Sequence, residues 1–254
     1  MTHALIGHTG FVGGNLARQH AFDAVFHSAN VDEMRGRTFD LVVCAGVRAE
    51  KWKANADPAA DAAGIARLEA VLDDVTATRF VLVSTVDVFA HPAGVDEDTP
   101  VDTASVQAYG RNRRALEEYA ARRFDSTIVR LPGLYGPGLK KNIIYDLLHT
   151  HEVHKIDARG VFQFYGVGRL WTDIEVMLAA RLPVVHLPPE PVSVADVARV
   201  AFGIEFTNQL AAPPARYDVR TKHDALFGGR DGYVEDRQRV LHGIRDFVSA
   251  ERRA

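Results

Sequence analysis

Several features that mark common protein classes are scarce or missing in this chain of 254 residues. Cys44 is the only cysteine, so an internal disulfide is impossible and a cytoplasmic protein is expected. No stretch reaches the ~18 apolar residues of a membrane-spanning helix. The chain enters the apolar segment 4–6 without a basic stretch or cleavage site, so no secretory leader is expected. Because the net charge is −3, neither nucleic acid nor a membrane is an expected partner.

Lysine is scarce as well, with 6 lysines against 24 arginines and none between Lys53 and Lys140. At positions that need only a positive charge, the choice of arginine over lysine is a compositional bias and carries no functional information. It becomes informative where an enzyme mechanism requires lysine.

The first half of the chain alternates apolar runs with helical patterns. Such alternation with short links predicts an α/β protein with a parallel, doubly wound Rossmann-type sheet. The expected strands are 3–6, 24–28, 39–44, 79–84 and 126–131, and the expected helices are 12–20, one from Pro58 with Asp57 as its cap, and 105–123.

The pattern changes after Pro132, where a turn-rich segment at 133–138 follows. Beyond it we expect helices near 142–150, 169–181, 193–202 and 234–251, and a strand at 183–187. These boundaries predict a dinucleotide-binding core in residues 1–131. Residues 132–254 are expected to form a small, mainly substrate-binding lobe interleaved with that core.

The first strand leads into a loop of spacing G-x-x-G-x-x-G, formed by Gly7, Gly10 and Gly13. Glycines at a strand-to-helix turn let backbone amides approach a pyrophosphate, which predicts a dinucleotide cofactor. An acidic residue after the second strand would indicate NAD, but Ser28 stands there. Arg35 and Arg37 follow and could meet a 2′-phosphate, which favours NADP over NAD, unless both are solvated surface residues.

Together with this loop, three later segments resemble the extended short-chain dehydrogenase/reductase superfamily. The resemblance is to its NAD-dependent epimerase/dehydratase group, which acts on nucleotide sugars. The segments are Val83–Phe89, Val129–Gly138 and Glu190–Ala198. In the first of them Thr85 takes the place of the family's catalytic hydroxyl residue. Tyr109 follows 24 residues later, at the interval of the family's catalytic tyrosine.

The resemblance implies Thr85, Tyr109 and Arg113 as catalytic residues. It also implies a cofactor site and a set of substrate contacts. The cofactor residues would be Gly7, Thr9, Gly10, Phe11, Val12, Gly13, Ser28, Cys44, Ala45, Gly46, Ser84, Tyr109, Arg113 and Pro132. The substrate contacts would be Trp52, Lys140, Lys141 and Asn142, and a homodimer is left open.

The chain departs from the family pattern at several sites. The family motif Tyr-x-x-x-Lys ends here in Arg113. The family's substrate-contacting asparagine is replaced by Gly133, its diphosphate-binding arginine by Phe162, and its paired aspartates by Gly168 and Arg169.

Tyr109 and Arg113 are four residues apart and share one helix face. A phenol of pKa near ~10 needs a nearby cation to exchange a proton at neutral pH. Arg113 keeps the charge of the family lysine but cannot pass on a proton. Thr85 would donate a hydrogen bond to the same substrate oxygen, and hydride would move to or from a nicotinamide.

Other polar residues allow two interpretations. Lys140 and Lys141 precede a helix that could hold a diphosphate, or they are solvated. Arg48, Lys51, Trp52 and Lys53 follow the third strand, at the edge where such folds bind ligands. His149, His151 and His154 are not spaced as a helix-face pair, so no metal site is expected. Cys44 lies in an apolar strand and is expected to be a buried, inert thiol.

Three functions remain in competition. The first is an NAD(P)-dependent oxidoreductase or epimerase of a nucleotide sugar, most simply a keto-sugar reductase. The second is a non-catalytic dinucleotide-binding protein with a degenerate site, which Arg113 favours. The third is a dehydratase, which ranks lowest because Asp87 is the only carboxylate beside Thr85.

Overall fold

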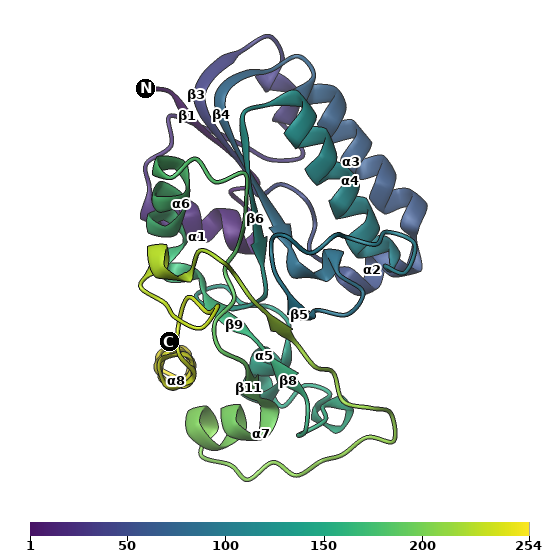
Figure 1. Ribbon diagram of the computed structural model, residues 1–254, viewed down its shortest axis with the longest axis vertical. Coiled ribbons are helices and arrows are strands. Elements are labelled where there is room, and N and C mark those ends of the chain that lie inside the picture. The colour runs from purple at the N-terminus through teal and green to yellow at the C-terminus, as the bar shows by residue number, and fades with distance from the viewer. Residues whose placement is uncertain (254) are drawn as a thin grey trace. The chain divides into compact units, whose positions relative to one another are not determined.

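The computed structural model describes residues 1–253, which form two compact units (Figure 1). The first contains Met1–Ala90, Thr99–Arg130 and Gly168–Val185. The second contains the other described residues.

A six-stranded sheet in the order β10-β6-β4-β3-β1-β2 forms the centre of the first unit and confirms the predicted α/β, Rossmann-type fold. Its strands are parallel. They are β1 (His3–Ile6), β2 (Ala24–Phe26), β3 (Thr38–Cys44), β4 (Thr76–Thr85), β6 (Ser126–Leu131) and β10 (Val184–His186). Register pairs Ile6 with Cys44 and Cys44 with Leu82, so β1, β3 and β4 end at one edge.

The strands form where the sequence is apolar on both faces. Val42 and Val43 of β3 are fully buried, since helices cover the sheet on each side. The helices α3 (Pro58–Leu72) and α4 (Ala108–Arg123) pack together, as do α1 (Phe11–Gln19) and α6 (Leu170–Ala179) (Figure 1). Asp57 caps α3 by accepting a hydrogen bond of 3.0 Å from the Ala60 amide, as predicted. The structure adds a helix that was not predicted, α2 (Lys51–Ala56).

The second unit is built from short elements. It contains three two-stranded sheets, which pair β7 with β9, β8 with β11, and β5 with β12. Its core gathers apolar side chains such as Ile144, Phe164 and Ile244. The elements are β5 (Ala93–Val95), β7 (Gly133–Tyr135), α5 (Ile143–His149), β8 (Val161–Phe162), β9 (Phe164–Gly166), β11 (Val192–Ser193), α7 (Val194–Val197) with a π-helical turn at Ala198–Phe202, β12 (Asp218–Val219) and α8 (Arg237–Glu251).

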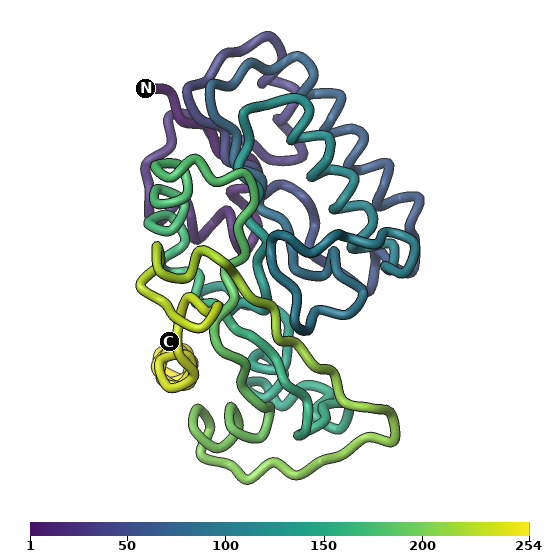
Figure 2. Tube along the Cα trace, in the orientation of Figure 1, coloured from purple at the N-terminus to yellow at the C-terminus, as the bar shows by residue number. Residues whose placement is uncertain are grey.

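A long segment after α7, residues 204–215, contains no helix or strand (Figure 2). Backbone and side-chain hydrogen bonds hold it in place. Asn208 donates to the Ile156 carbonyl at 2.6 Å, and the Val161 amide donates to the Ala215 carbonyl at 2.9 Å.

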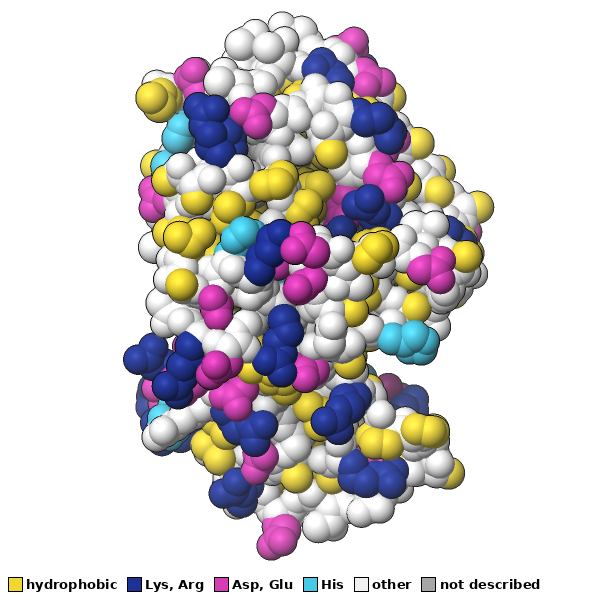
Figure 3. Space-filling view, in the orientation of Figure 1, with side chains coloured by type: hydrophobic (Ala, Val, Ile, Leu, Met, Phe, Trp, Pro, Cys, Tyr) yellow, Lys and Arg dark blue, Asp and Glu magenta, His cyan; other side chains and the backbone are white. Residues whose placement is uncertain are grey.

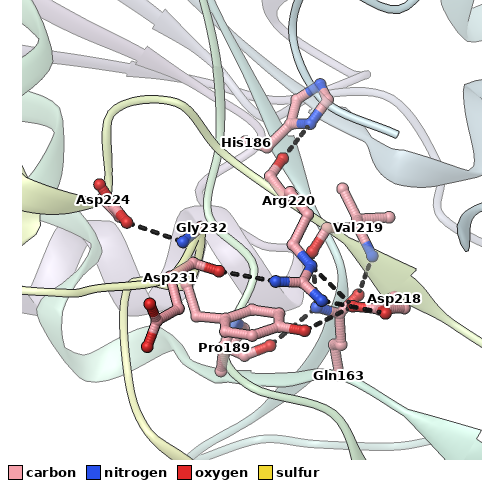
Figure 4. A network of polar contacts seen from close by, with 10 residues as sticks. Gln163, His186, Pro189, Asp218, Val219, Arg220, Asp224, Asp231 and Gly232 are labelled. Atoms are coloured by element: carbon pink, nitrogen blue, oxygen red, sulfur yellow. Dashed lines mark hydrogen bonds and ion pairs between the residues drawn. The ribbon is translucent and has the colours of Figure 1, made fainter. Parts of the chain in front are cut away.

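A buried glutamine ties β12, which follows this segment, to the rest of the second unit (Figure 4). Gln163 donates to the carbonyls of Pro189 and Val219, at 2.8 and 2.9 Å, and accepts from the Val219 amide at 2.8 Å. Next to it, Asp218 accepts from Arg220 at 3.0 Å and from the Tyr233 hydroxyl at 2.6 Å. These bonds satisfy polar groups that the short sheets leave unpaired.

Among residues 1–253 the structure contains neither a membrane-spanning helix nor a cluster of metal-binding side chains. In this range no helix has the length and apolar character needed to cross a membrane. In the same range no three His, Cys, Asp or Glu side chains gather in a group that could hold a metal ion.

Candidate active site

The glycine loop between β1 and α1 fits a dinucleotide. Gly7 has φ +91°, and a Cβ there would lie 2.4 Å from the Ala45 carbonyl oxygen. A Cβ on Gly13 would lie 2.1 Å from the Gly7 carbonyl oxygen. Any side chain at either position would push the loop apart. The amides of Phe11, Val12 and Gly13 open α1, where no intrahelical acceptor reaches them, so they can bind a pyrophosphate.

Arg35 does not lie at the carboxyl end of β2, which contradicts its expected role. Arg35 pairs with Asp74 at 2.6 Å and donates to the Ala70 carbonyl at 2.6 Å. Ala70 lies in the last turn of α3, and Asp74 lies in the link from α3 to the amino end of β4. Arg37 directly precedes β3, and its guanidinium lies 5.0 Å from the Phe39 ring centre. The same guanidinium lies 5.4 Å from the ring centre of Phe26, the last residue of β2, so a 2′-phosphate contact of Arg37 stays a prediction.

Two histidines stand at the carboxyl end of β2 instead, and the sequence analysis did not identify them. His8 Nδ1 lies 3.1 Å from the Phe26 carbonyl oxygen, and that acceptor requires the ring proton on Nδ1. His27 Nδ1 accepts from the Ala29 amide at 3.2 Å, so its ring proton is on Nε2. The two ring centres are 5.4 Å apart. His27 thus presents an N–H donor near the exposed Ser28, where an acid would indicate NAD.

The two predicted catalytic hydroxyls are brought together. Thr85 ends β4, and Tyr109 lies in the first turn of α4 with 7% of its surface exposed. The Thr85 hydroxyl lies close enough to the Tyr109 phenol to act on the pKa of that phenol. Thr85 Oγ1 also accepts from the Asp87 amide at 3.1 Å.

The Arg113 guanidinium carbon lies 4.0 Å from the centre of the Tyr109 ring. Both of its terminal nitrogens are also engaged in hydrogen bonds. Two of its nitrogens donate to Asp61 at 2.5 and 2.9 Å, and further bonds reach the carbonyls of Arg48 and Tyr109. The side chains of Arg113 and Asp61 are only 6% and 11% exposed. This guanidinium therefore joins α4 to α3.

The pKa of the Tyr109 phenol is raised to about 12. Burial is the largest cause, and the negative charges of Asp87 and Asp61 add to it. Arg113 and the Thr85 hydroxyl act in the opposite direction and are outweighed. The acidifying cation expected from the sequence is present, but its effect is too small to make the phenol acidic.

The other predicted cofactor residues of the first unit surround the same sheet edge. Ser84 directs its hydroxyl into the protein, where it donates to Glu117 at 2.6 Å, and Arg130 donates to the same carboxylate. Ala45 and Gly46 follow β3 beside the glycine loop. Cys44 is buried, and desolvation raises the pKa of its thiol to about 11, which agrees with an inert thiol.

The predicted substrate contacts differ in their surroundings. Trp52 on α2 is 67% exposed and open to a ligand. In the second unit Lys140 and Lys141 are exposed, and Pro132 is buried. Asn142 caps α5 by accepting from the amides of Ile144 and Tyr145 at 3.0 and 3.3 Å, and it donates to the Leu134 carbonyl. Its amide is therefore engaged within the protein.

Charges of both signs alternate over the face seen in Figure 3, without an extended patch of either sign.

The profile of the NAD dependent epimerase/dehydratase family matches residues 19–173, more than half of the chain. No curated protein matches the chain. The glycine loop precedes the matched segment, whereas Thr85, Tyr109 and Arg113 lie within it.

Solved structures similar to this chain include a reductase, a dehydratase and an epimerase. A dTDP-4-dehydrorhamnose reductase from Clostridium acetobutylicum is 16% identical, with a TM-score of 0.75 over 99% of this chain and 100% of the other. An NAD-dependent NDP-hexosamine 5,6-dehydratase of tunicamycin biosynthesis is 19% identical, with a TM-score of 0.78 over 100% of this chain and 99% of the other. A UDP-glucose 4-epimerase from Thermotoga maritima is 17% identical, with a TM-score of 0.73 over 100% of this chain and 99% of the other. At such identities the likeness concerns the fold and leaves the reaction open.

Proposed function

The chain belongs to the NAD dependent epimerase/dehydratase family, and we propose that it is an NAD(P)-dependent oxidoreductase that reduces the keto group of a nucleotide-activated sugar. The observation that carries this proposal is the proximity of the Thr85 hydroxyl at the end of β4 to the Tyr109 phenol in the first turn of α4. The pair lies where β4 ends, at the sheet edge that also bears the glycine loop.

The two hydroxyls would act together on the substrate carbonyl oxygen. A bound reduced nicotinamide supplies the hydride. Thr85 donates a hydrogen bond to the carbonyl oxygen, which stabilises negative charge as it develops. Tyr109 delivers its phenolic proton to that oxygen, and the product is an alcohol.

The protonation state of Tyr109 favours reduction over epimerisation. With a pKa of about 12, the phenol is protonated at neutral pH and is ready to donate. Oxidation of a sugar hydroxyl requires the phenolate as a base, and epimerisation includes such an oxidation step. Reduction needs only the form that the folded protein stabilises.

We propose NADP as the preferred cofactor, now on the basis of His27. An imidazole N–H can donate to a 2′-phosphate, whereas the two ribose hydroxyls of NAD are best met by a carboxylate acceptor. The tautomer assigned to His27 supplies such a donor at the end of β2. Residues 132–254 are proposed to carry most substrate contacts, with Lys140 and Lys141 for a diphosphate, and Trp52 is proposed to add one from the first unit.

Single-turnover oxidation of bound NADPH over a panel of keto-sugar nucleotides tests this function. The wild type should oxidise NADPH with at least one substrate, and Tyr109→Phe should bind NADPH but fail to oxidise it. The competing proposal, a non-catalytic binding protein, is favoured by the engagement of Arg113 with Asp61. It predicts cofactor binding with no turnover in either protein.

A further inference from the structure

We propose that Lys51, by pairing with Asp87, supplies the exchangeable positive charge that the Tyr109 site lacks at position 113. The consequence for turnover rests on the proposed reductase function, whereas the electrostatic effect on Tyr109 does not. Lys51 is a positioning residue in this proposal, because it acts on the phenol through Asp87.

Helix α2 is fixed against the first turn of α4 by Asn55. The Asn55 side chain accepts from the Tyr109 amide at 2.9 Å and donates to Gln107 at 2.7 Å. Lys51 lies four residues before Asn55, so both project from the same face of α2. The contact that positions Tyr109 therefore also brings a lysine to this end of α4.

Asp87 receives the lysine and is itself held beside both catalytic hydroxyls. Lys51 Nζ lies 3.0 Å from Asp87 Oδ1. The Asp87 amide donates to Thr85 Oγ1 at 3.1 Å. The Asp87 carbonyl oxygen packs against Gly110, where an added Cβ would approach it to 2.0 Å. Asp87 is thus fixed between Thr85 and the residue that follows Tyr109.

Arg113 cannot provide an exchangeable charge. Both of its terminal nitrogens already donate to Asp61 and to backbone carbonyls, and a guanidinium does not release a proton at physiological pH. The Lys51 side chain is 44% exposed, so its ammonium is in contact with water. When the phenol gives its proton to the substrate oxygen, a proton from the solvent later returns to it. In the meantime the ammonium offsets the negative charge of Asp87, which would otherwise oppose the transient phenolate.

Three charged side chains act directly on the pKa of the Tyr109 phenol. Asp87 and Asp61 raise the pKa of Tyr109, and Arg113 lowers it. Asp61 is neutralised by Arg113 on α4, and Asp87 is neutralised by Lys51 on α2. Without Lys51, the carboxylate of Asp87 would oppose phenolate formation with its full charge. A half-exposed ion pair contributes little to folding, so replacing Lys51 should leave the fold intact.

The test measures the phenol directly in the intact protein. Tyrosines are replaced biosynthetically by a fluorinated tyrosine of lower intrinsic pKa, and the fluorine resonance absent from Tyr109→Phe is followed against pH. Lys51→Ala should raise the midpoint of this resonance by about half a pH unit, a threefold change in proton affinity. Lys51→Arg should keep the midpoint near that of the wild type.

Two further variants isolate the route through Asp87. Asp87→Asn should lower the midpoint, and Lys51→Ala should then have no further effect. Lys53→Ala is the matched control, because Lys53 lies on the same helix but pairs with Glu50 at 2.6 Å, and it should leave the midpoint unchanged. An unchanged midpoint in Lys51→Ala, or an equal shift in the Asp87→Asn background, would overturn the proposal. Since no substrate is needed, a shift in a protein without turnover would support this inference while refuting the reductase function.

Discussion

Replacing Arg113 tests whether this side chain serves the fold or the chemistry. It forms two hydrogen bonds with Asp61, at 2.5 and 2.9 Å, and the two side chains are 6% and 11% exposed. Removing one member of a buried ion pair leaves the other charge uncompensated, at a cost of about 3–5 kcal/mol. We expect Arg113→Met to lower the free energy of unfolding by that amount, which corresponds to a fall in Tm of about 6–20 °C.

The second half of the cycle removes both charges. In Arg113→Met/Asp61→Leu no buried charge is left without a partner, so most of the lost stability should return. Arg113→Lys keeps the charge but loses the bidentate hydrogen bond to Asp61. Its free energy of unfolding should therefore lie between those of the wild type and Arg113→Met. Urea unfolding measures all four proteins, and the midpoint should move while the m-value stays constant.

Turnover of the folded fraction completes the experiment. If Arg113 acts mainly through Asp61, the double variant should regain NADPH oxidation together with its stability. A different result would refute this reasoning. Arg113→Met could unfold at the same urea concentration as the wild type and yet have lost NADPH oxidation. In that case the ion pair with Asp61 would not be the principal role of Arg113, and the chemical role expected from the sequence would apply.

The remaining predictions concern the cofactor loop, the cofactor preference and the pH dependence. Gly13→Ala should abolish dinucleotide binding by calorimetry, because its Cβ would lie 2.1 Å from the Gly7 carbonyl oxygen. The control Gly64→Ala in α3, where a Cβ meets nothing within 4 Å, should bind normally. His27→Ala should weaken NADPH about tenfold and NADH much less in a fluorescence titration, since a lost hydrogen bond to a charged group costs about 1.5 kcal/mol or more. Equal losses for both cofactors would exclude a 2′-phosphate contact. The burial of Tyr109 raises its pKa from 10.0 to about 12, so its contribution to stability is complete below pH ~10 and is lost as pH rises through 12. The same shift keeps the proton donor intact, so the phenol should cause no fall in reduction rate between pH 6 and ~9, and a fall that reports Tyr109 in that range would contradict the assignment.

Local sequence patterns were sufficient for the architecture. The residues of β1 and β6 agree with the predicted bounds, and the cap at Asp57 lies where it was expected. A buried strand and a capped helix are each determined by neighbouring residues, through apolar runs and side chains that bond the first amides. The interval between Thr85 and Tyr109 is not local in this sense, because residues 86–107, which include β5, separate the end of β4 from the start of α4.

Only the tertiary structure decided which charges act on the site. Arg113 matched the family lysine by spacing, but its partner Asp61 lies on another helix. Arg35 follows β2 closely in sequence, yet the chain crosses to the opposite sheet edge before reaching it. The pairs of His8 with His27 and of Lys51 with Asp87 join residues from different elements. Electrostatic effects depend on distance and burial in three dimensions, so one sequence can predict which groups are present but not which of them meet.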